Sequence, residues 1–221
     1  MPYRRTENVV RRLAARHDAI VSAARTLAAE SGMAGVQIAP VAARAGIAAG
    51  TVYRYFPSKT DLVAALIGTL SEREIATMRR AADAAPGPLS ALAATIATFA
   101  GRALAHRKLA WAVIAEPVDA ELDALRLTFR KALATELEAR LRTAIVGGHL
   151  PELDATLAAA ALIGALMEGL IGPLAPDTDD PAKARGAAQT LTLMALRAVG
   201  VVDAHARGLV VQTALPIREA K

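Results

Sequence analysis

The chain has 221 residues, of which 54% are hydrophobic and only 3% aromatic. Alanine and leucine supply most of the apolar residues, and because both favour helices while β-formers are scarce, we expect an all-α fold. The chain contains no cysteine, which excludes disulfides, thiolate metal sites and cysteine nucleophiles and fits a reducing cytoplasm. Its length allows one large domain or a small domain fused to a medium one.

The formal net charge of +5 is distributed unevenly along the chain. Residues 1–60 contain nine Lys or Arg residues and three acidic ones, a net charge of +6, whereas the rest of the chain carries −1. This asymmetry is typical of a polyanion-binding module attached to a neutral domain. A solvated basic tail explains the charge equally well.

The N-terminal part of the sequence predicts three helices. Apolar residues repeat at helical spacing over residues 20–28, and Gly32 lies where a helix commonly ends in a left-handed cap. A short second helix begins after Gln37, Gly46 ends it after two turns, and residues 49–56 form a third. Two short helices around a glycine turn predict a helix-turn-helix unit. The side chains expected to face inward are Ile38, Val41, Ala42, Val52 and Phe56.

The rest of the chain reads as a series of longer helices. Pro57 ends the third helix, and Ser58 with Asp61 predicts a capping-box start for a fourth that continues to about residue 82. The sequence Pro-Gly-Pro at 86–88 is the clearest break in the chain. We assign no structure to the tail after Gly200, so that about nine helices are expected in total. The later helices are expected at 89–105, 107–115, 120–145, 153–174 and 181–199.

The segment from Ile38 to Leu62 reads IAPVAARAGIAAGTVYRYFPSKTDL. Together with the first helix, it strongly resembles the helix-turn-helix signature of TetR-family regulators over about residues 16–66. The glycine turn, the Gly-Thr-Val-Tyr opening, the aromatic pair and the Ser-Lys helix start all occur at the spacing of that family. The resemblance implies a DNA-binding domain at 1–60 and a larger helical domain at 61–221 for ligand sensing and dimerisation.

The physical requirements of groove binding agree with this resemblance. A helix that enters the major groove needs small residues at its leading end and donors beside it for phosphates. Tyr53 and Tyr55 are either phosphate ligands or core aromatics. Gln37 and Ala48 stand where the family usually has Ser or Thr, so we expect one helix cap and one phosphate hydroxyl to be lost. The candidate DNA-binding residues are Gln37, Arg44, Ala49, Gly50, Thr51, Tyr53, Arg54, Tyr55 and Lys59.

Two further segments allow more than one interpretation. The basic run from Arg4 to Arg16 is either an arm that touches DNA or a solvated extension. Residues 155–175 have about the length of a membrane span and a single charged residue, Glu168. We favour a buried interface helix, because an unpaired carboxylate inside a membrane is costly. Glu168 should therefore be buried beside an Arg or Lys, or contact a ligand.

The same segment predicts a homodimer. Small residues recur every four positions at Ala161, Ala165 and Gly169, and such a stripe lets another helix approach closely. Together with residues 186–198 it forms a plausible two-fold interface between two copies of the chain. In proteins of the TetR family, the last two long helices form a four-helix dimer bundle, so the resemblance and the pattern agree.

No catalytic pattern is present. The four histidines are isolated, and there is no metal-ligand spacing, phosphate-cradling loop or nucleophile elbow, so we expect no enzyme, cofactor or metal site. The candidate ligand-binding residues are Met78, Phe99, Trp111, Phe129, Met167 and Glu168. Plain core packing explains the five apolar ones equally well.

The sequence as a whole predicts a cytoplasmic transcriptional regulator. We expect a repressor that binds a palindromic duplex DNA operator as a homodimer and is released by a small apolar effector, without contact to a membrane. Two alternatives stay open: a dimeric DNA-binding protein whose second domain senses no ligand, and a membrane-surface protein that uses residues 153–174.

Overall fold

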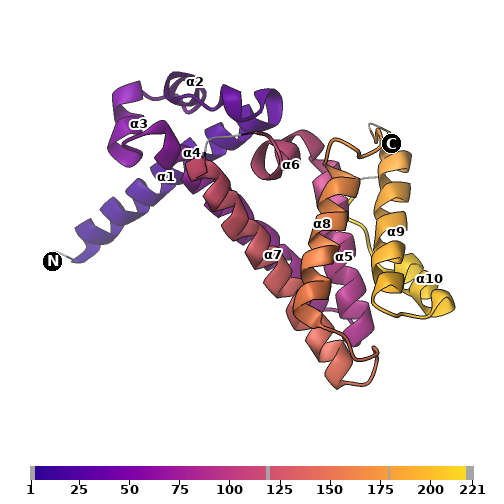
Figure 1. The fold of residues 1–221 in the computed structure, drawn as a ribbon. Coiled ribbons are helices and arrows are strands. Elements are labelled where there is room, and N and C mark those ends of the chain that lie inside the picture. The colour runs from indigo at the N-terminus through magenta and orange to yellow at the C-terminus, as the bar shows by residue number, and fades with distance from the viewer. Residues whose placement is uncertain (1–2, 118–119, 179, 218–221) are drawn as a thin grey trace.

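The computed structural model describes residues 3–117, 120–178 and 180–217, with their side chains from Glu7 onward. These residues form ten α-helices and one 3-10 turn, which confirms the all-α prediction. Figure 1 shows α2 and α3 at one end of the molecule and α8, α9 and α10 at the other. The elements are α1 (Tyr3–Ser31), η1 (Met33–Gly35), α2 (Ile38–Arg44), α3 (Ala49–Tyr55), α4 (Lys59–Asp83), α5 (Pro88–Ala105), α6 (Arg107–Ile114), α7 (Ala120–Val146), α8 (Ala155–Leu170), α9 (Pro181–Ala198) and α10 (Asp203–Gln212).

The first three α-helices pack around a small apolar core. Helix α1 packs on α2, and α2 packs on α3. The His17 ring lies 5.0 Å from the Phe56 ring, which joins α1 to the end of α3. Gly32 follows α1 with a φ of 70°, which confirms the predicted helix end. All five side chains expected to face inward are buried, namely Ile38, Val41, Ala42, Val52 and Phe56.

Helix α4 connects the two ends of the molecule. It begins with the predicted capping box: the Asp61 amide donates to Ser58 Oγ at 3.1 Å, and the Ser58 amide donates to Asp61 Oδ2 at 3.0 Å. The helix continues for 25 residues and packs against α1, α5 and α7. A movement of α4 would therefore displace both the helix-turn-helix unit and the helices behind it.

Helix α5 lies at the centre of the helices that follow the helix-turn-helix unit. It packs against α4, α7, α9 and α10, and 67% of its residues are buried. By length and composition it could cross a membrane, but the buried core helix of a globular protein has the same features. Helix α8, in the window that the sequence marks as apolar, is only 16 residues long.

Two sequence predictions about the second half need correction. The tail after Gly200 does contain a helix, α10, whose residues Ala206, Leu209 and Val210 are buried in the core. Its ten residues are too few for a stable isolated helix, so packing against α5 and α9 supplies what the local sequence does not. Helix α8 is shorter at both ends than the predicted 153–174, because Asp154 caps its start and it ends at Leu170.

Candidate functional site

The helix-turn-helix unit is built around the turn between α2 and α3. Gly46 adopts a φ of 67° there, a conformation that side-chain-bearing residues rarely adopt. Val41 and Val52 are fully buried, one on each helix. Their burial fixes which face of α3 is turned inward, so the opposite face of α3 is available to a partner.

That outer face of α3 has the properties of a recognition surface. Gly50, Tyr53 and Arg54 are exposed, and 52% of the Tyr53 side-chain surface is accessible. A Cβ built on Gly50 would have no atom within 4 Å, so the helix backbone is open to a partner at this point. An accessible backbone, a hydroxyl and a guanidinium together suit the edge of a DNA groove.

Other candidate residues of α3 and its surroundings are less exposed. Ala49 and Tyr55 are half-buried and pack against the core, so Tyr55 has a structural role as well as a hydroxyl to offer. Thr51 is half-buried too. The side chain of Gln37 donates to the Ala34 carbonyl at 3.0 Å instead of capping α2.

Neither α2 nor α3 has a side-chain cap at its start, whereas the sequence predicted the loss of one cap. Neither Gln37 nor Ala48, the N-cap residues, makes a capping hydrogen bond. At the start of α4, by contrast, Lys59 is exposed directly after the Ser58 cap. The Lys59 ammonium therefore stands beside a helix N-terminus, where an anion is favoured.

Arg44 is engaged within the protein. Its guanidinium donates to both carboxylate oxygens of Glu30, at 2.9 and 2.6 Å, which ties the end of α2 to the end of α1. The hydrogen bonds from Arg44 lower the pKa of Glu30. Both side chains are exposed to solvent, so the pair adds little to stability and can be exchanged for a phosphate contact.

The first half of α1 extends away from the rest of the molecule (Figure 1). Arg11 and Arg12 are exposed on it, together with the apolar side chains of Val9, Val10 and Leu13. The side chains of Arg4 and Arg5 lie outside the described residues. A helical extension is therefore present, and its basic residues point into solvent rather than into the core.

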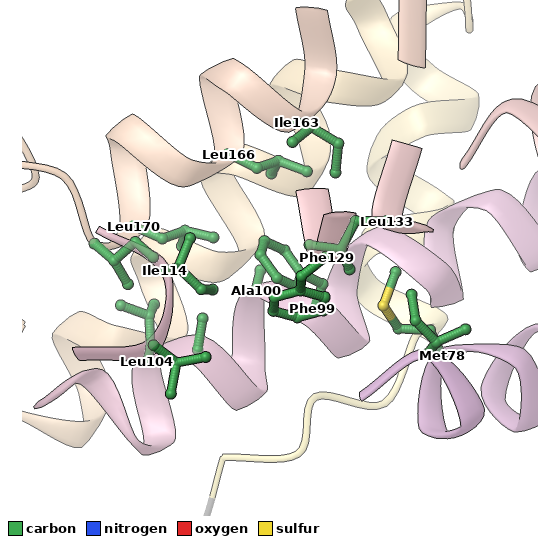
Figure 2. Close-up of a cluster of buried hydrophobic side chains, with 14 of the residues drawn as sticks. Met78, Phe99, Ala100, Leu104, Ile114, Phe129, Leu133, Ile163, Leu166 and Leu170 are labelled. Carbon is green, nitrogen blue, oxygen red and sulfur yellow. The ribbon is translucent and has the colours of Figure 1, made fainter. Parts of the chain in front are cut away.

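The candidate ligand residues fall into two separate hollows and one core position. Phe99 and Phe129 line a hollow between α1, α4, α5, α6 and α7. Trp111, Met167 and Glu168 line a second hollow between α6, α7 and α8. Figure 2 shows Phe99 and Phe129 at the centre of a buried cluster that also holds Met78. Met78 is only 1% exposed and lines neither hollow.

Glu168 is not buried, contrary to the prediction. Its side chain is exposed on α8, accepts a hydrogen bond from the Leu174 amide at 3.0 Å and packs over Gly172. The sequence pattern implied burial because the neighbours of Glu168 are apolar. In the structure Leu166 and Leu170 are buried in the core, whereas Glu168 is exposed and its carboxylate holds the loop after the helix.

Sequence reasoning missed several polar residues that line the first hollow. Arg25, Arg73, Glu74, Arg102 and His106 all line the first hollow. Arg102 is the single charged residue within the apolar stretch of α5, and this isolation could have marked it in the sequence as a candidate site residue. The other four look like ordinary surface residues in the sequence, because their helices meet only in the folded protein.

A direct link between the two ends of the molecule was also missed. The Met33 amide, just after α1, donates to Glu116 Oε2 at 2.8 Å, just after α6. Helices α1 and α6 also pack against each other. At the end of α6, the buried Arg126 of α7 donates to the carbonyls of Ala112 and Glu116. Helix α6 lines both hollows and is thus physically connected to the helix-turn-helix unit.

The fold and the exposed face of α3 are those of a helix-turn-helix protein with further long helices behind this unit. Residues 20–66 match the family described as bacterial regulatory proteins of the tetR family. The transcriptional repressor KstR of Mycolicibacterium smegmatis is 42% identical over 77 residues, which are 35% of this chain and 38% of that protein. KstR of Mycobacterium tuberculosis is 39% identical over 77 residues, 35% of each chain. The match thus covers little more than a third of either repressor.

Solved structures share the fold along most of the chain. RolR in complex with resorcinol superposes with a TM-score of 0.66 at 23% identity, covering 94% of this chain and 98% of that one. FadR of Bacillus subtilis in complex with stearoyl-CoA has a TM-score of 0.71 at 22% identity, covering 83% and 98%. Residues 20–66 are thus similar in sequence to the tetR family of regulatory proteins, and most of the chain shares the fold of these solved structures. The family that residues 20–66 match is one of regulatory proteins, which agrees with the expectation that the chain is not an enzyme.

Proposed function

We propose that the protein is a repressor that binds a palindromic DNA operator as a homodimer and leaves it when a small, largely apolar effector binds. The observation that carries the DNA-binding part is the outer face of α3, where Gly50, Tyr53 and Arg54 are exposed while Val52 faces the core. Residues 1–60 would form the DNA-binding domain and residues 61–221 the sensing and dimerisation domain. Such a regulator would act in the cytoplasm.

Base readout and phosphate contacts would be divided among the exposed residues. Arg54 and Thr51 on α3 would reach base edges, while Tyr53 and Lys59 would donate to phosphates. The projecting half of α1 would add phosphate contacts beside the groove. Arg44 would contribute only after release from Glu30, which its solvent exposure permits.

Repression and effector release are supported by the relatives. The KstR proteins are transcriptional repressors, and RolR and FadR were solved with resorcinol and stearoyl-CoA bound. In this chain the first hollow offers the apolar lining that small-molecule sites usually have. Because α6 lines that hollow and Glu116 holds the turn after α1, an effector that displaces α6 would also displace the recognition helix.

Dimerisation is supported by the outer faces of α8 and α9. Ala161 and Ala165 are exposed on α8, beside Leu157, which is 68% exposed, and Met194 of α9, which is 45% exposed. Gly169, the third residue of the predicted stripe, packs instead on Leu191 of α9 within the same chain. A two-fold dimer through this face would present two recognition helices to half-sites roughly 34–36 Å apart.

The test is selection of bound sequences from random duplex DNA with the full chain. We expect enrichment of a palindrome, and a triple variant lacking the Tyr53, Tyr55 and Lys59 side chains should lose the affinity of the wild type. Unchanged affinity in that variant would overturn the assignment. Trp111 is the single tryptophan and lies on α6, so its fluorescence should report effector binding. If binders change this signal but none weakens operator binding, the second domain only dimerises.

A further inference from the structure

The first hollow has an apolar side and a cationic side. Phe99, Leu109 and Phe129 are among the apolar residues that line it, whereas the charged residues come from three different helices. Arg25 belongs to α1, and Arg73 belongs to α4. The third arginine at the opening is Arg102 of α5, so three guanidinium groups that are far apart in the sequence meet at one opening.

The positive charge of this opening is only partly compensated. Glu74 is the single acidic residue of the lining, and its Oε2 accepts a hydrogen bond from Arg102 Nε at 2.7 Å. The guanidinium groups of Arg25 and Arg73 make no hydrogen bond or ion pair to any residue that the structure describes. Three guanidinium groups against one carboxylate leave two positive charges beside an apolar chamber.

This positive charge affects the pKa values of the titratable residues beside it. Burial lowers the pKa of His106 below its ordinary 6.5, and the charges of Arg102, Arg25 and Arg73 lower it further. All three guanidinium groups therefore lie close enough to His106 to lower the pKa of the same imidazole. Burial also raises the pKa of Glu74, against the influence of Arg102 and Arg73, and Glu74 Oε1 is buried without a hydrogen-bond partner.

On the basis of the proposed function, we propose that the effector is an apolar carboxylate. Its hydrocarbon body lies between Phe99 and Phe129, and its carboxylate binds the guanidinium groups of Arg73 and Arg25 at the opening. Carboxylates are the groups that guanidinium forks bind most specifically. Because Arg25 belongs to α1, the bound anion connects the helix-turn-helix unit directly to α4 and α5.

The test is calorimetric binding of three matched pairs of probes to the full chain. The pairs are phenylacetate and 2-phenylethanol, 1-naphthylacetate and 2-(1-naphthyl)ethanol, and decanoate and decan-1-ol. We expect at least one carboxylate to bind about 10-fold more tightly than its alcohol, which is the effect of one charge-assisted hydrogen bond. Arg73→Gln should remove that advantage, Glu74→Gln should increase it, and neither should change binding of the alcohol. Arg80→Gln, an exposed arginine of α4 outside the hollow, is the matched control.

A second readout separates an anion site from a general apolar site. Bound carboxylate should raise the pKa of His106 by about one unit, measured by NMR titration, whereas bound alcohol should leave it unchanged. Assignment of the His106 signal requires only the His106→Asn variant, since the chain has four histidines.

The outcomes distinguish this proposal from the function on which it rests. Equal binding of carboxylates and alcohols, or tight carboxylate binding that Arg73→Gln and Arg25→Gln leave unchanged, would overturn the anion proposal while an effector site in the hollow stands. Failure of every probe to bind would overturn the anion proposal and the hollow as effector site together. Operator binding by the same preparation would still support the DNA-binding regulator.

Discussion

The contact between Gly32 and Glu116 joins the helix-turn-helix unit to α6 and can be tested by a double-mutant cycle. A Cβ on Gly32 would lie 2.8 Å from Glu116 Oε2, the same oxygen that accepts the Met33 amide. Because a real Cβ cannot approach so closely, Gly32→Ala should push the carboxylate away and break the hydrogen bond. Gly32 also has φ 70° and ψ −172°, a region open essentially to glycine alone.

The expected magnitudes follow from these two effects. Glu116→Ala should destabilise the protein by about 1–3 kcal/mol, because it leaves a part-buried amide without an acceptor. Gly32→Ala should lose the same hydrogen bond and add about 1–3 kcal/mol of backbone strain. The double variant loses the hydrogen bond only once. Its free energy of unfolding should therefore exceed the additive expectation by about 1–3 kcal/mol.

The measurement is urea unfolding of the four proteins of the cycle, followed by circular dichroism. Gly46→Ala is the matched control, because Gly46 has a similar φ of 67° but no atom within 4 Å of its added Cβ. Its cost should add to that of Glu116→Ala within about 0.5 kcal/mol. Additive costs for Gly32→Ala and Glu116→Ala would refute the reasoning, since the carboxylate would then not be held against Gly32.

Three other changes have defined outcomes. Lys59→Ala should weaken binding to all DNA sequences by a similar factor and lower the slope of log K against log salt by about one unit, as expected for one lost phosphate contact. Ala165→Glu should convert a dimer to monomers in light scattering, because it places a charge on the exposed face of α8. Glu136→Gln should destabilise the protein at pH 7. Burial alone would raise the pKa of Glu136, but hydrogen bonds from Arg79 and Arg140 lower that pKa below 4.5. The stability advantage of the wild type is therefore present above pH 4.5 and should shrink as the pH falls below that value.

Each of these changes has a control and a contrary result. Lys131→Ala, on the exposed face of α7, should leave DNA affinity unchanged, and an equal loss there would argue against a specific role of Lys59. Val146→Glu, at a side chain 89% exposed at the end of α7, should leave the oligomeric state unchanged. A wild-type chain that is monomeric at micromolar concentration would contradict the dimer. If the wild type and the Glu136→Gln variant differed in stability by a constant amount from neutral pH down to about pH 3, the ion-pair argument would be contradicted.

The sequence by itself was enough to predict the DNA-binding end of the molecule. There, short-range signals decide the structure: Gly32 and Gly46 need a positive φ, Ser58 and Asp61 form a capping box, and Pro57 prevents the third helix from continuing. Each signal acts within a few residues, so the end of α1, the turn between α2 and α3, the start of α4 and the inward side chains could be predicted without knowledge of the fold, whereas the start of α1 at Tyr3 could not.

Only the tertiary structure decided how the second domain is arranged. Helix α10 exists because α5 and α9 cover its apolar face, and Glu168 is exposed because of how α8 is rotated against its neighbours. Arg25 and Arg73 lie far apart in the sequence and share one opening only because α1 and α4 pack together. Helical periodicity specifies which side of a helix is apolar, but the position of a charge in space depends on which helix packs against that side, and this information is spread over the whole chain.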